Sequence, residues 1–352
     1  MNETTATTRK FGMPIMLLVS LPILTTVCPP LSAQDTRRPY RTFAKTNQIV
    51  LDVGAKGTFD STQAKYPCVL KVGDEWWMWY NGRTDDRFTG SIGLATSKDG
   101  VRWTKQNNGD PVFDHGPRGT FDSTKVDHPA VLRFDGKFHV WYTAGDDSSR
   151  YTIGYATSPD GIHWTRENNA RPVLGPGEPG QFDDQVVLHP AVVRDDSGLL
   201  YMWYNGVGPQ KSFRVGHATS PDGVQWVRQN HGKPVLEPSV VGDFHEGYVY
   251  NVFAMLEEGQ FHMWYSAWAP NERKSRPNHN CITHAVSSTG DEWKKDSTPT
   301  LTNGAAGSID EYACFACNIV HRGDEWWMYY SAGSRSTGGP YRVSLATCRL
   351  SE

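Results

Sequence analysis

Apolar and polar residues alternate in short segments along most of the chain, and turn-forming residues separate these segments. Residues 138–143 (FHVWYT) alternate as expected for a strand with one buried face. The preceding residues 134–137 (FDGK) have the composition of a hairpin turn, and residues 129–133 (PAVLR) before them form a mainly apolar segment. The pattern therefore predicts antiparallel strands joined by tight hairpins.

The same pattern repeats five times, which indicates a radial architecture. An aromatic pair recurs at steps of 62, 62, 61 and 65 residues, as Trp79-Tyr80, Trp141-Tyr142, Trp203-Tyr204, Trp264-Tyr265 and Tyr329-Tyr330. A Ser-x-Asp-Gly-x-x-Trp turn recurs at residues 97–103, 158–164 and 220–226. In the second unit, residues 153–157 and 172–174 supply a third and a fourth strand. Four antiparallel strands per unit predict an all-β fold, a five-bladed β-propeller.

The two ends of the repeat complement each other. The fifth unit stops after its third strand, at residues 343–347, whereas residues 52–60 align with residues 114–122 of the next unit. Residues 47–53 are therefore a fourth strand without its own blade, and we expect them to close the ring in blade five. This predicts one domain over 34–352, with blades near 59–120, 121–181, 182–243, 244–308 and 309–352 plus 47–53.

The two faces of this propeller differ in sequence. The hairpins between first and second strands and the Ser-x-Asp-Gly turns share one face and hardly vary. The opposite face carries the crossovers between blades and the loops after each second strand, which vary greatly. Because function concentrates on varied loops over a rigid scaffold, we expect the ligand site on that second face, at the axis, where the inner strands begin.

The amino end has the composition of a targeting segment. Arg9 and Lys10 precede an apolar run over residues 11–27, and a small residue, Ala33, follows at a cleavage position. A signal peptide over 1–33 predicts a secreted or periplasmic protein, and a membrane anchor is the alternative; no other segment is a candidate span. With 35 Lys+Arg against 38 Asp+Glu, the net charge of −3 gives no electrostatic case for nucleic acid.

Five cysteines remain after the predicted cleavage, and an odd number leaves at least one outside any internal disulfide. Cys314 and Cys317 have redox-like or metal-like spacing, but they lie in an apolar strand with no second pair to complete a zinc site. Buried core thiols are the preferred interpretation. The pairing stays open for Cys68, Cys281, Cys314, Cys317 and Cys348.

The repeated segments resemble a known superfamily. Phe-Asp followed by His-Pro-Ala-Val, then Tyr-Met-Trp-Tyr-Asn-Gly and Ile-Gly-Tyr-Ala-Thr-Ser-Pro-Asp-Gly-Ile-His-Trp, is similar to the five-bladed glycosidases over residues 43–350. That superfamily includes the arabinanases and xylosidases of glycoside hydrolase family 43, the invertases and levansucrases of families 32 and 68, family 117, and the mannoside phosphorylases of family 130. The resemblance implies three carboxylates around the axis.

Asp60, Asp184 and Glu246 follow the implied order, at steps of 124 and 62 residues. Inverting hydrolysis needs a base that activates water and an acid that protonates the leaving oxygen. The resemblance implies Asp60 or Asp127 as the base, Asp184 as a modulator and Glu246 as the acid. Glu311 is a further candidate. The alternative is that these carboxylates have structural roles. The Asp60 position recurs as Asp122, Asp183 and Asp310, which is typical of a turn-capping residue.

The family commonly has an aspartate directly before the proline of the inner strand. Here Tyr66, His128 and His189 occupy those positions, and Lys65 precedes the first of them. Lys65 and Tyr66 are candidates for contacting sugar hydroxyls. His128 and His189 are candidate hydrogen-bonding groups, ligands of a structural ion or water, or core residues. Of the 13 tryptophans, Trp268 alone lies outside the repeat, in the longest loop. It is a candidate for stacking against a sugar ring, or a residue that packs the loop.

These observations favour an exported glycoside hydrolase acting on a polysaccharide or oligosaccharide, without a cofactor. Three alternatives stay open. A carbohydrate-binding propeller would lack a usable acid and base, and a phosphorylase would need a cationic phosphate site beside one carboxylate. A structural surface protein would have no ligand. The sequence leaves the sugar, its linkage and the oligomeric state open.

Overall fold

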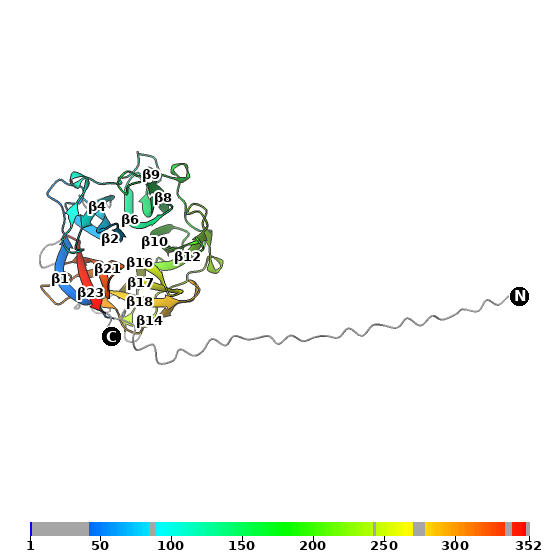
Figure 1. The fold of residues 1–352 in the computed structure, drawn as a ribbon. Coiled ribbons are helices and arrows are strands. Elements are labelled where there is room, and N and C mark those ends of the chain that lie inside the picture. Colours follow the sequence, from blue (N-terminus) through cyan, green and yellow to red (C-terminus); the bar gives the residue numbers. More distant parts are fainter. Residues whose placement is uncertain (2–41, 85–88, 242–243, 270–278, 335–339, 350–352) are drawn as a thin grey trace. The chain divides into compact units, whose positions relative to one another are not determined.

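The computed structural model describes residues 1, 42–84, 89–241, 244–269, 279–334 and 340–349. From residue 42 onward these residues form five main antiparallel sheets around one axis, as Figure 1 shows, which confirms the predicted propeller. The predicted signal peptide over 1–33 lies outside the described residues. Within the described part, no helix is long and apolar enough to cross a membrane.

Each blade is a meander whose first strand lies nearest the axis. Blade I contains β2 (Gln63–Val72), β3 (Glu75–Arg83), β4 (Ser91–Ser97) and β5 (Thr104–Lys105). Blade II contains β6 (Lys125–Phe134), β7 (Lys137–Gly145), β8 (Tyr151–Ser158) and β9 (Thr165–Arg166). Blade III contains β10 (Val186–Arg194), β11 (Leu200–Val207), β12 (Arg214–Ser220) and β13 (Val227–Arg228).

Blade IV contains β16 (Tyr248–Glu257), β17 (Gln260–Ala269), β18 (His279–Ser287) and β19 (Lys294–Lys295), and β20 (Leu301–Thr302) also pairs with β18. A short hairpin of β14 (Val240–Val241) and β15 (Phe244–His245) precedes this blade. Blade V contains β21 (Ala313–Arg322), β22 (Glu325–Gly333), β23 (Arg342–Arg349) and β1 (Ala44–Leu51). The remaining elements are the short 3-10 turns Asn107–Gly109, Asn168–Ala170 and Asn230–Gly232.

The outer strand of blade II differs from the prediction. Residues 172–174 were expected to form it, but the fourth strand is β9, which pairs with β8 directly after the Ser-x-Asp-Gly turn. Leu174 forms only an isolated bridge with Ile153. A 3-10 turn separates the two pieces, because Asn168, Asn169 and Ala170 have positive φ and interrupt the strand.

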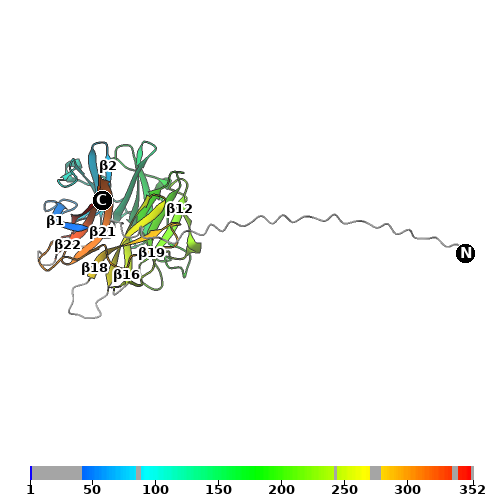
Figure 2. The same ribbon diagram turned by 60° about the horizontal axis from the view of Figure 1, so that its bottom comes forward.

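The N-terminal strand β1 closes the ring, as the sequence predicted. It pairs antiparallel with β23, and Figures 1 and 2 place it in the same blade as β21 and β22. Its register jumps between Lys45 and Ile49, and Asn47 has a φ of 56° there. In blades I to III the outer strand is divided into a short fourth strand and a later isolated bridge. β1 is one continuous strand that corresponds to both of these pieces.

Neighbouring blades are joined by tryptophan side chains. The indole N–H of Trp79, Trp141 and Trp203 donates to a glycine carbonyl in the next blade, each at 2.9 Å, on Gly161, Gly223 and Gly290. The Tyr329 hydroxyl of blade V donates in the same way to Gly100 of blade I, at 2.8 Å. Gly161 has a φ of 75°, and a Cβ there would lie 2.9 Å from the Trp79 ring, so both backbone and space require glycine.

Each blade also holds one buried carboxylate between a tyrosine of the second strand and a cation of the outer strand. The tyrosine hydroxyl donates to the carboxylate at 2.8–3.0 Å in all five blades. The sets are Asp60–Tyr80–Lys105, Asp122–Tyr142–Arg166, Asp183–Tyr204–Arg228, Glu246–Tyr265–Lys295 and Asp310–Tyr330–Lys45. We call these sets the blade triads. In blade V the cation comes from β1, so the closing strand completes that triad.

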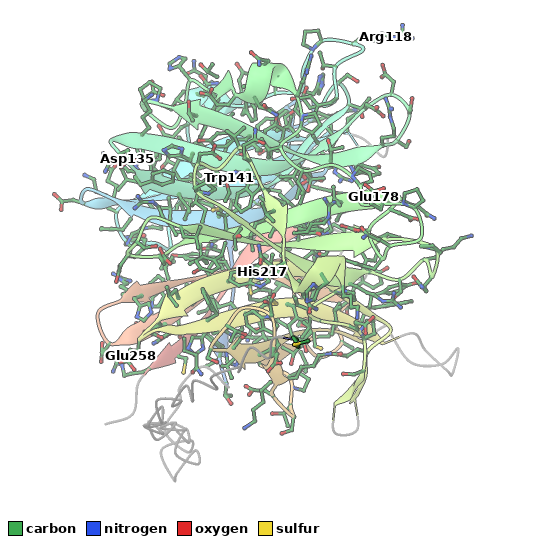
Figure 3. All side chains as sticks on the ribbon, turned by 90° about the vertical axis from the view of Figure 1, so that its right-hand side faces the viewer. Arg118, Asp135, Trp141, Glu178, His217 and Glu258 are labelled. Atoms are coloured by element: carbon green, nitrogen blue, oxygen red, sulfur yellow. The ribbon has the colours of Figure 1, made fainter. Side chains whose placement is uncertain are left out.

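The two faces are arranged as the repeat predicted. Figure 3 views the blades edge-on: the hairpin-turn residues Asp135 and Glu258 lie at one face, and the crossover residues Arg118 and Glu178 lie toward the other. The inner strands begin at the crossover face and end at the hairpin face. The N-terminal ends of β2, β6, β10, β16 and β21 therefore converge at the crossover face.

Removing β1 tests the closure. A truncation that deletes residues 1–51 should expose the edge of β23 and leave Asp310 without its cation. We expect unfolding at a temperature lower by about 10 °C or more, since roughly 5 kcal/mol corresponds to that in a domain of this size. A truncation of residues 1–38 keeps β1 and is the control. Differential scanning calorimetry measures both, and equal melting temperatures would contradict a closing role for β1.

Candidate functional site

The crossover-face end of every inner strand contains a bulge with left-handed backbone. The register of all five inner strands shifts at this point, and the bulged residue has a φ between 47° and 56°. These residues are Tyr66, His128, His189, Asn251 and Ala316. A bulge of this kind re-aims a side chain within a regular strand. The five bulges therefore place one chosen side chain per blade around the axis.

Side chains of the second strands hold these bulges in place across blade boundaries. The backbone N–H groups of Tyr66, His189, Asn251 and Ala316 donate to Ser331, Thr143, Asn205 and Ser266 of the preceding blade, at 2.8–3.0 Å. At the boundary of blades I and II the pattern changes. There the His128 N–H donates at 2.9 Å to the carboxylate of its own neighbour, Asp127. The blade I–II boundary therefore differs from the others, because a carboxylate there replaces the neutral side chain of the preceding blade.

Four bulge side chains meet at the axis. The Tyr66 ring stacks on the His128 ring, with centroids 3.4 Å apart, and the His128 and His189 rings are 3.7 Å apart. His128 Nε2 lies 2.7 Å from Asn251 Oδ1, which links blade II to blade IV. Burial lowers the pKa of both histidines, and Asp127 opposes this effect in each case. The two imidazoles are therefore held as neutral, hydrogen-bonding rings.

Charged side chains surround this aromatic group on blades I and II. Asp127 accepts from Arg83 at 2.9 Å, and both side chains are more than 90% buried. Lys65 and Lys125 are 4% and 8% exposed, and their ammonium groups lie 4.6 Å from the ring centres of Tyr66 and Tyr151. We call Lys65, Arg83, Lys125 and Asp127 the charged cluster. Among the described residues, this cluster contains three cationic side chains and one carboxylate.

The protonation states in the charged cluster follow from these neighbours. Burial alone would raise the pKa of Asp127, but the hydrogen bond from His128 and the charges of Arg83 and Lys125 hold that pKa well below its usual range. Burial lowers the pKa of Lys65 to about 7, with Arg83 and Lys125 acting in the same direction and Asp127 against them. Asp127 is therefore a permanent anion at neutral pH, whereas Lys65 titrates there.

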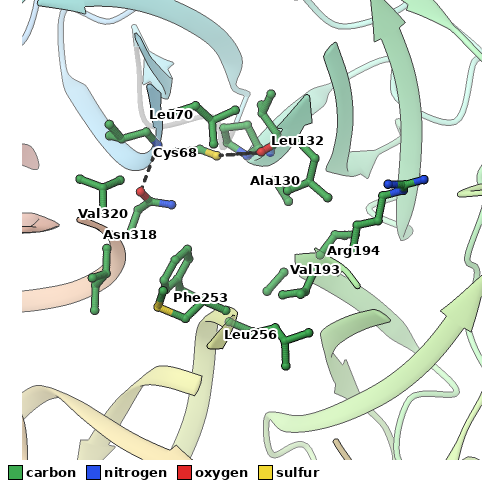
Figure 4. Close-up of a pocket in the computed structure, with 18 of the residues that line it drawn as sticks. Cys68, Leu70, Ala130, Leu132, Val193, Arg194, Phe253, Leu256, Asn318 and Val320 are labelled. Atoms are coloured by element: carbon green, nitrogen blue, oxygen red, sulfur yellow. Dashed lines mark hydrogen bonds between the residues drawn. The ribbon is translucent and has the colours of Figure 1, made fainter. Parts of the chain in front are cut away.

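A cavity of about 1080 Å³, lined by apolar and polar side chains, occupies the axis below the bulges. Tyr66, His128 and Asn251 lie at one end of it, and its lining extends down the inner strands to the hairpin turns. In Figure 4, aliphatic side chains such as Leu70, Leu132 and Val320 surround its open centre. The charged residues that line the cavity, such as Arg133, Arg194 and Asp195, lie toward the hairpin face, so we place the candidate site at the charged cluster and the bulges of the crossover face.

The predicted catalytic carboxylates do not converge on one site. Asp60 and Glu246 each belong to a blade triad. Asp184 accepts from the N–H of Gly180 at 2.7 Å, and Glu311 accepts from the N–H of Gly307 at 2.6 Å, so both brace crossover turns. Among the described residues, Asp127 is the predicted carboxylate in contact with the bulge residues.

The predicted substrate-binding residues lie closer together. Lys65, Tyr66, His128 and His189 all belong to the charged cluster or the bulges. Trp268 was expected in a loop, but it lies in β17, paired with Tyr248 and Asn280. The strand extends further than the sequence suggested, because β16 and β18 both continue beside it. The Trp268 ring stacks on Tyr248 with centroids 5.1 Å apart.

Sequence reasoning did not select Arg83, Lys125 or Asn251 as site residues. A comparison of repeat positions would have pointed to Arg83 and Lys125, because the equivalent pairs in the other three blades are the uncharged Val186–Val207, Tyr248–Trp268 and Ala313–Gly333. The residue before each bulge is Lys65, Asp127, Leu188, Tyr250 and Phe315, so charge appears only in blades I and II. A further prediction concerned the thiols: Cys68, Cys281, Cys314 and Cys317 are buried, as expected for core residues, and Cys348 is half-buried.

The fold is the five-bladed propeller of the glycosidase superfamily that the repeated segments resemble. The chain belongs to glycoside hydrolase family 130, because residues 33–269 match the family described as β-1,4-mannooligosaccharide phosphorylase. This family was among those that the repeated segments resemble. The match covers β1, blades I to III and the first two strands of blade IV.

Individual relatives agree with this family. The uncharacterized protein MT1551 of Mycobacterium tuberculosis is 28% identical over 189 residues, covering 50% of this chain and 58% of that protein. The 1,2-β-oligomannan phosphorylase of a Thermoanaerobacter species is 26% identical over 163 residues, covering 44% and 53%. The chain thus matches little more than half the length of these curated relatives.

A solved structure agrees in fold. It is described by the statement that the GH130 family of mannoside phosphorylases contains glycoside hydrolases that target β-1,2 mannosidic linkages in Candida mannan. The TM-score is 0.68 at 16% identity, and the match covers 87% of this chain and 93% of that one.

A substitution at Glu246 separates a structural from a catalytic role. Glu246→Gln should leave Lys295 and Tyr265 without their anionic partner, and we expect a loss of about 3 kcal/mol of unfolding free energy with turnover per folded molecule retained. Asp122→Asn makes the matching change in the blade II triad and should cost a similar amount. Urea unfolding measures both. Loss of turnover in Glu246→Gln at unchanged stability would instead support the acid role implied by the superfamily.

Proposed function

We propose that the protein is a glycoside phosphorylase that cleaves mannosides with inorganic phosphate. One observation carries the proposal: among the described residues at the axial end of blades I and II, three buried cations lie around one ionised carboxylate. A phosphorylase needs such a cationic site beside one carboxylate, because phosphate replaces water as the nucleophile. The family supports the mannoside part, since its description and one curated relative are both mannan-type phosphorylases.

The charge balance of the cluster favours a bound dianion. Lys65, Arg83 and Lys125 carry three positive charges when protonated and Asp127 carries one negative charge, which leaves two positive charges. An anionic ligand gains affinity from charge-assisted hydrogen bonds to such cations. Hydrogen phosphate carries about two negative charges at neutral pH, and its oxygens suit the planar donors of arginine.

The sugar-binding part of the proposal rests on aromatic side chains near the cluster. Tyr66 and Tyr341 flank the Lys65 ammonium, and the stacked pair of Trp268 and Tyr248 lies at the crossover-face end of blade IV. Aromatic faces suit the apolar faces of sugar rings. We propose Tyr66 and Trp268 as stacking groups, and His128, His189 and Asn251 as the polar floor that orients hydroxyl groups.

A mannoside hydrolase is the second candidate, and the solved neighbour favours it, since its description attributes hydrolases to the same family. A hydrolase of the inverting kind requires an acid and a base at a suitable separation. Asp127 can act as the base, but the predicted partners Asp60, Asp184 and Glu246 are engaged elsewhere. A phosphorylase therefore leaves fewer catalytic roles without an assigned residue than a hydrolase does. Export through the predicted signal peptide stays part of the proposal for either activity.

The deciding experiment compares turnover with and without phosphate. The purified protein is incubated with β-1,4- and β-1,2-linked mannooligosaccharides, and mannose 1-phosphate and free mannose are quantified by ion chromatography. A phosphorylase forms mannose 1-phosphate only when phosphate is present. Release of free mannose at the same rate in phosphate-free buffer would establish the hydrolase. Binding without turnover on both panels would favour a carbohydrate-binding propeller.

Arg83 is the residue whose loss should affect phosphate use most directly. We expect Arg83→Met to reduce phosphate-dependent kcat/KM by about 100-fold, because roughly 3 kcal/mol of charge-assisted hydrogen bonding to the anion is lost. Initial rates at varied phosphate measure this effect. Arg150→Met, at an exposed arginine on the same face, is the control and should behave as the unchanged protein. An Arg83→Met variant that is stable and equally active would contradict the phosphate site.

A further inference from the structure

The residue after each aromatic pair of the second strands faces the bulge of the next blade. These residues are Asn81, Thr143, Asn205, Ser266 and Ser331. The last four accept the N–H of the next bulge, at 2.8–3.0 Å. Asn81 occupies the equivalent position at the blade I–II boundary, where Asp127 accepts the His128 N–H instead. One position of the five therefore does not form the contact that the repeat assigns to it.

Asn205 shows what an asparagine at this position does when it holds a bulge. Its Oδ1 accepts from the Asn251 N–H at 2.9 Å, and its Nδ2 donates to the Val249 carbonyl at 3.0 Å. The Asn81 side chain is fully buried, and its Nδ2 donates to the Ser91 carbonyl at 3.4 Å. Among the described residues, nothing donates to its Oδ1. Asn81 therefore has the position and the chemistry of a bulge-holding residue, but its acceptor oxygen is unused.

The two oxygens of Asp127 have separate partners. Its Oδ2 accepts from Arg83 and its Oδ1 accepts from the His128 N–H, both at 2.9 Å. An ionised carboxylate is a stronger acceptor than an amide, so Asp127 takes the N–H in preference to Asn81. If the carboxylate turned away and no second acceptor were present, a buried N–H would be left unpaired, which is strongly unfavourable. With Asn81 beside it, the N–H can change acceptor instead.

We infer that Asn81 is the replacement acceptor for the His128 N–H and so frees Asp127 to accept a hydrogen bond from a sugar hydroxyl. The inference rests on the proposed function and assigns a positioning residue to that same site. Without a glycan the N–H bonds to Asp127, and the Asn81 oxygen is unused. With a glycan the N–H bonds to Asn81, and a sugar hydroxyl donates to the released Oδ1. All three groups are paired only in the second arrangement, as buried polar groups generally are.

The backbone already has the geometry that the second arrangement needs. The bulge at His128, held by a carboxylate, has a φ of 47°, and the bulge at Asn251, held by Asn205, has a φ of 50°. The register shifts at the same place in both blades, directly after Asp127 and after Tyr250. The exchange of acceptors therefore requires rotation of side chains and no change in the pairing of any strand.

Thermal unfolding tests the exchange without a substrate. Asn81→Leu removes an oxygen that accepts no hydrogen bond, so its melting temperature should lie within about 2 °C of the unchanged protein. In an Asp127→Ala background the same substitution leaves the His128 N–H without either acceptor and should lower the melting temperature by about 5 °C. Asn205→Leu is the matched control and should cost about 5 °C alone, because its oxygen is in use. Equal small losses from Asn81→Leu in both backgrounds would overturn the exchange.

Glycan binding tests the role of the exchange in the proposed function. Isothermal titration of a mannooligosaccharide in phosphate-free buffer should show about 30-fold weaker binding to Asn81→Leu, because releasing Asp127 then leaves the N–H unpaired. Asn81→Thr supplies an acceptor of the kind that Thr143 provides at the next boundary, and it should bind within about threefold of the unchanged protein. The KM for phosphate should stay within about threefold in both variants, a separation that a general loss of structure does not produce.

Equal glycan affinity in Asn81→Leu and the unchanged protein would overturn the inference, and so would Asn81→Thr binding as weakly as Asn81→Leu. A crystal structure of Asp127→Ala should place Asn81 Oδ1 within hydrogen-bond distance of the His128 nitrogen, and an oxygen left out of reach would contradict the exchange. If Asp127→Ala does not fold, the titration of Asn81→Leu and Asn81→Thr decides. If the unchanged protein binds no mannooligosaccharide, the proposed function fails, whereas the melting temperatures and the Asp127→Ala structure still test the change of acceptor.

Discussion

The buried carboxylate of the blade triad, which recurs in every blade, is the contact on which the propeller depends. Every blade triad joins three separate segments: the crossover that brings the carboxylate, the second strand with its tyrosine, and the outer strand with its cation. A buried carboxylate is strongly unfavourable unless it is paired, so the outer strand is held where its cation can reach. The same requirement selects β1 as the closing strand, because Lys45 serves Asp310 as Arg166 serves Asp122.

The spacing of aromatic pairs was sufficient to predict the blades, because strand length, hairpins and blade size all repeat with it. The position of Glu246 could not be interpreted in the same way. The hairpin of β14 and β15 alters the crossover into blade IV, so the carboxylate stands one residue later than in the other blades and is longer by one methylene. In the sequence this displacement makes the residue distinct from its counterparts and favours a catalytic interpretation. In the fold its carboxylate occupies the same place in the triad.

The charged cluster was harder to predict, because it depends on a backbone feature without a sequence signature. Proline follows the bulge in blades I to III, but blades IV and V have bulges with no proline. Only the bulge decides that Lys65 and Asp127 sit beside the axial rings, and only the strand ends bring Arg83 and Lys125 to them. Burying three cations together opposes folding, so the paired blade triads around them supply the rigidity that keeps the cluster assembled.

The left-handed bulges have a consequence for what this architecture can become. Each presents one side chain toward the axis from a left-handed backbone that the preceding blade holds in four of the five cases, so the five positions are equivalent sockets around a common centre. Tyrosine, histidine, asparagine and alanine fill them here, and β-branched residues are disfavoured by the backbone geometry. Replacing the side chain at one of these positions alters the chemistry at the centre without shifting the register of any strand. A ring of this kind can therefore change its substrate one side chain at a time.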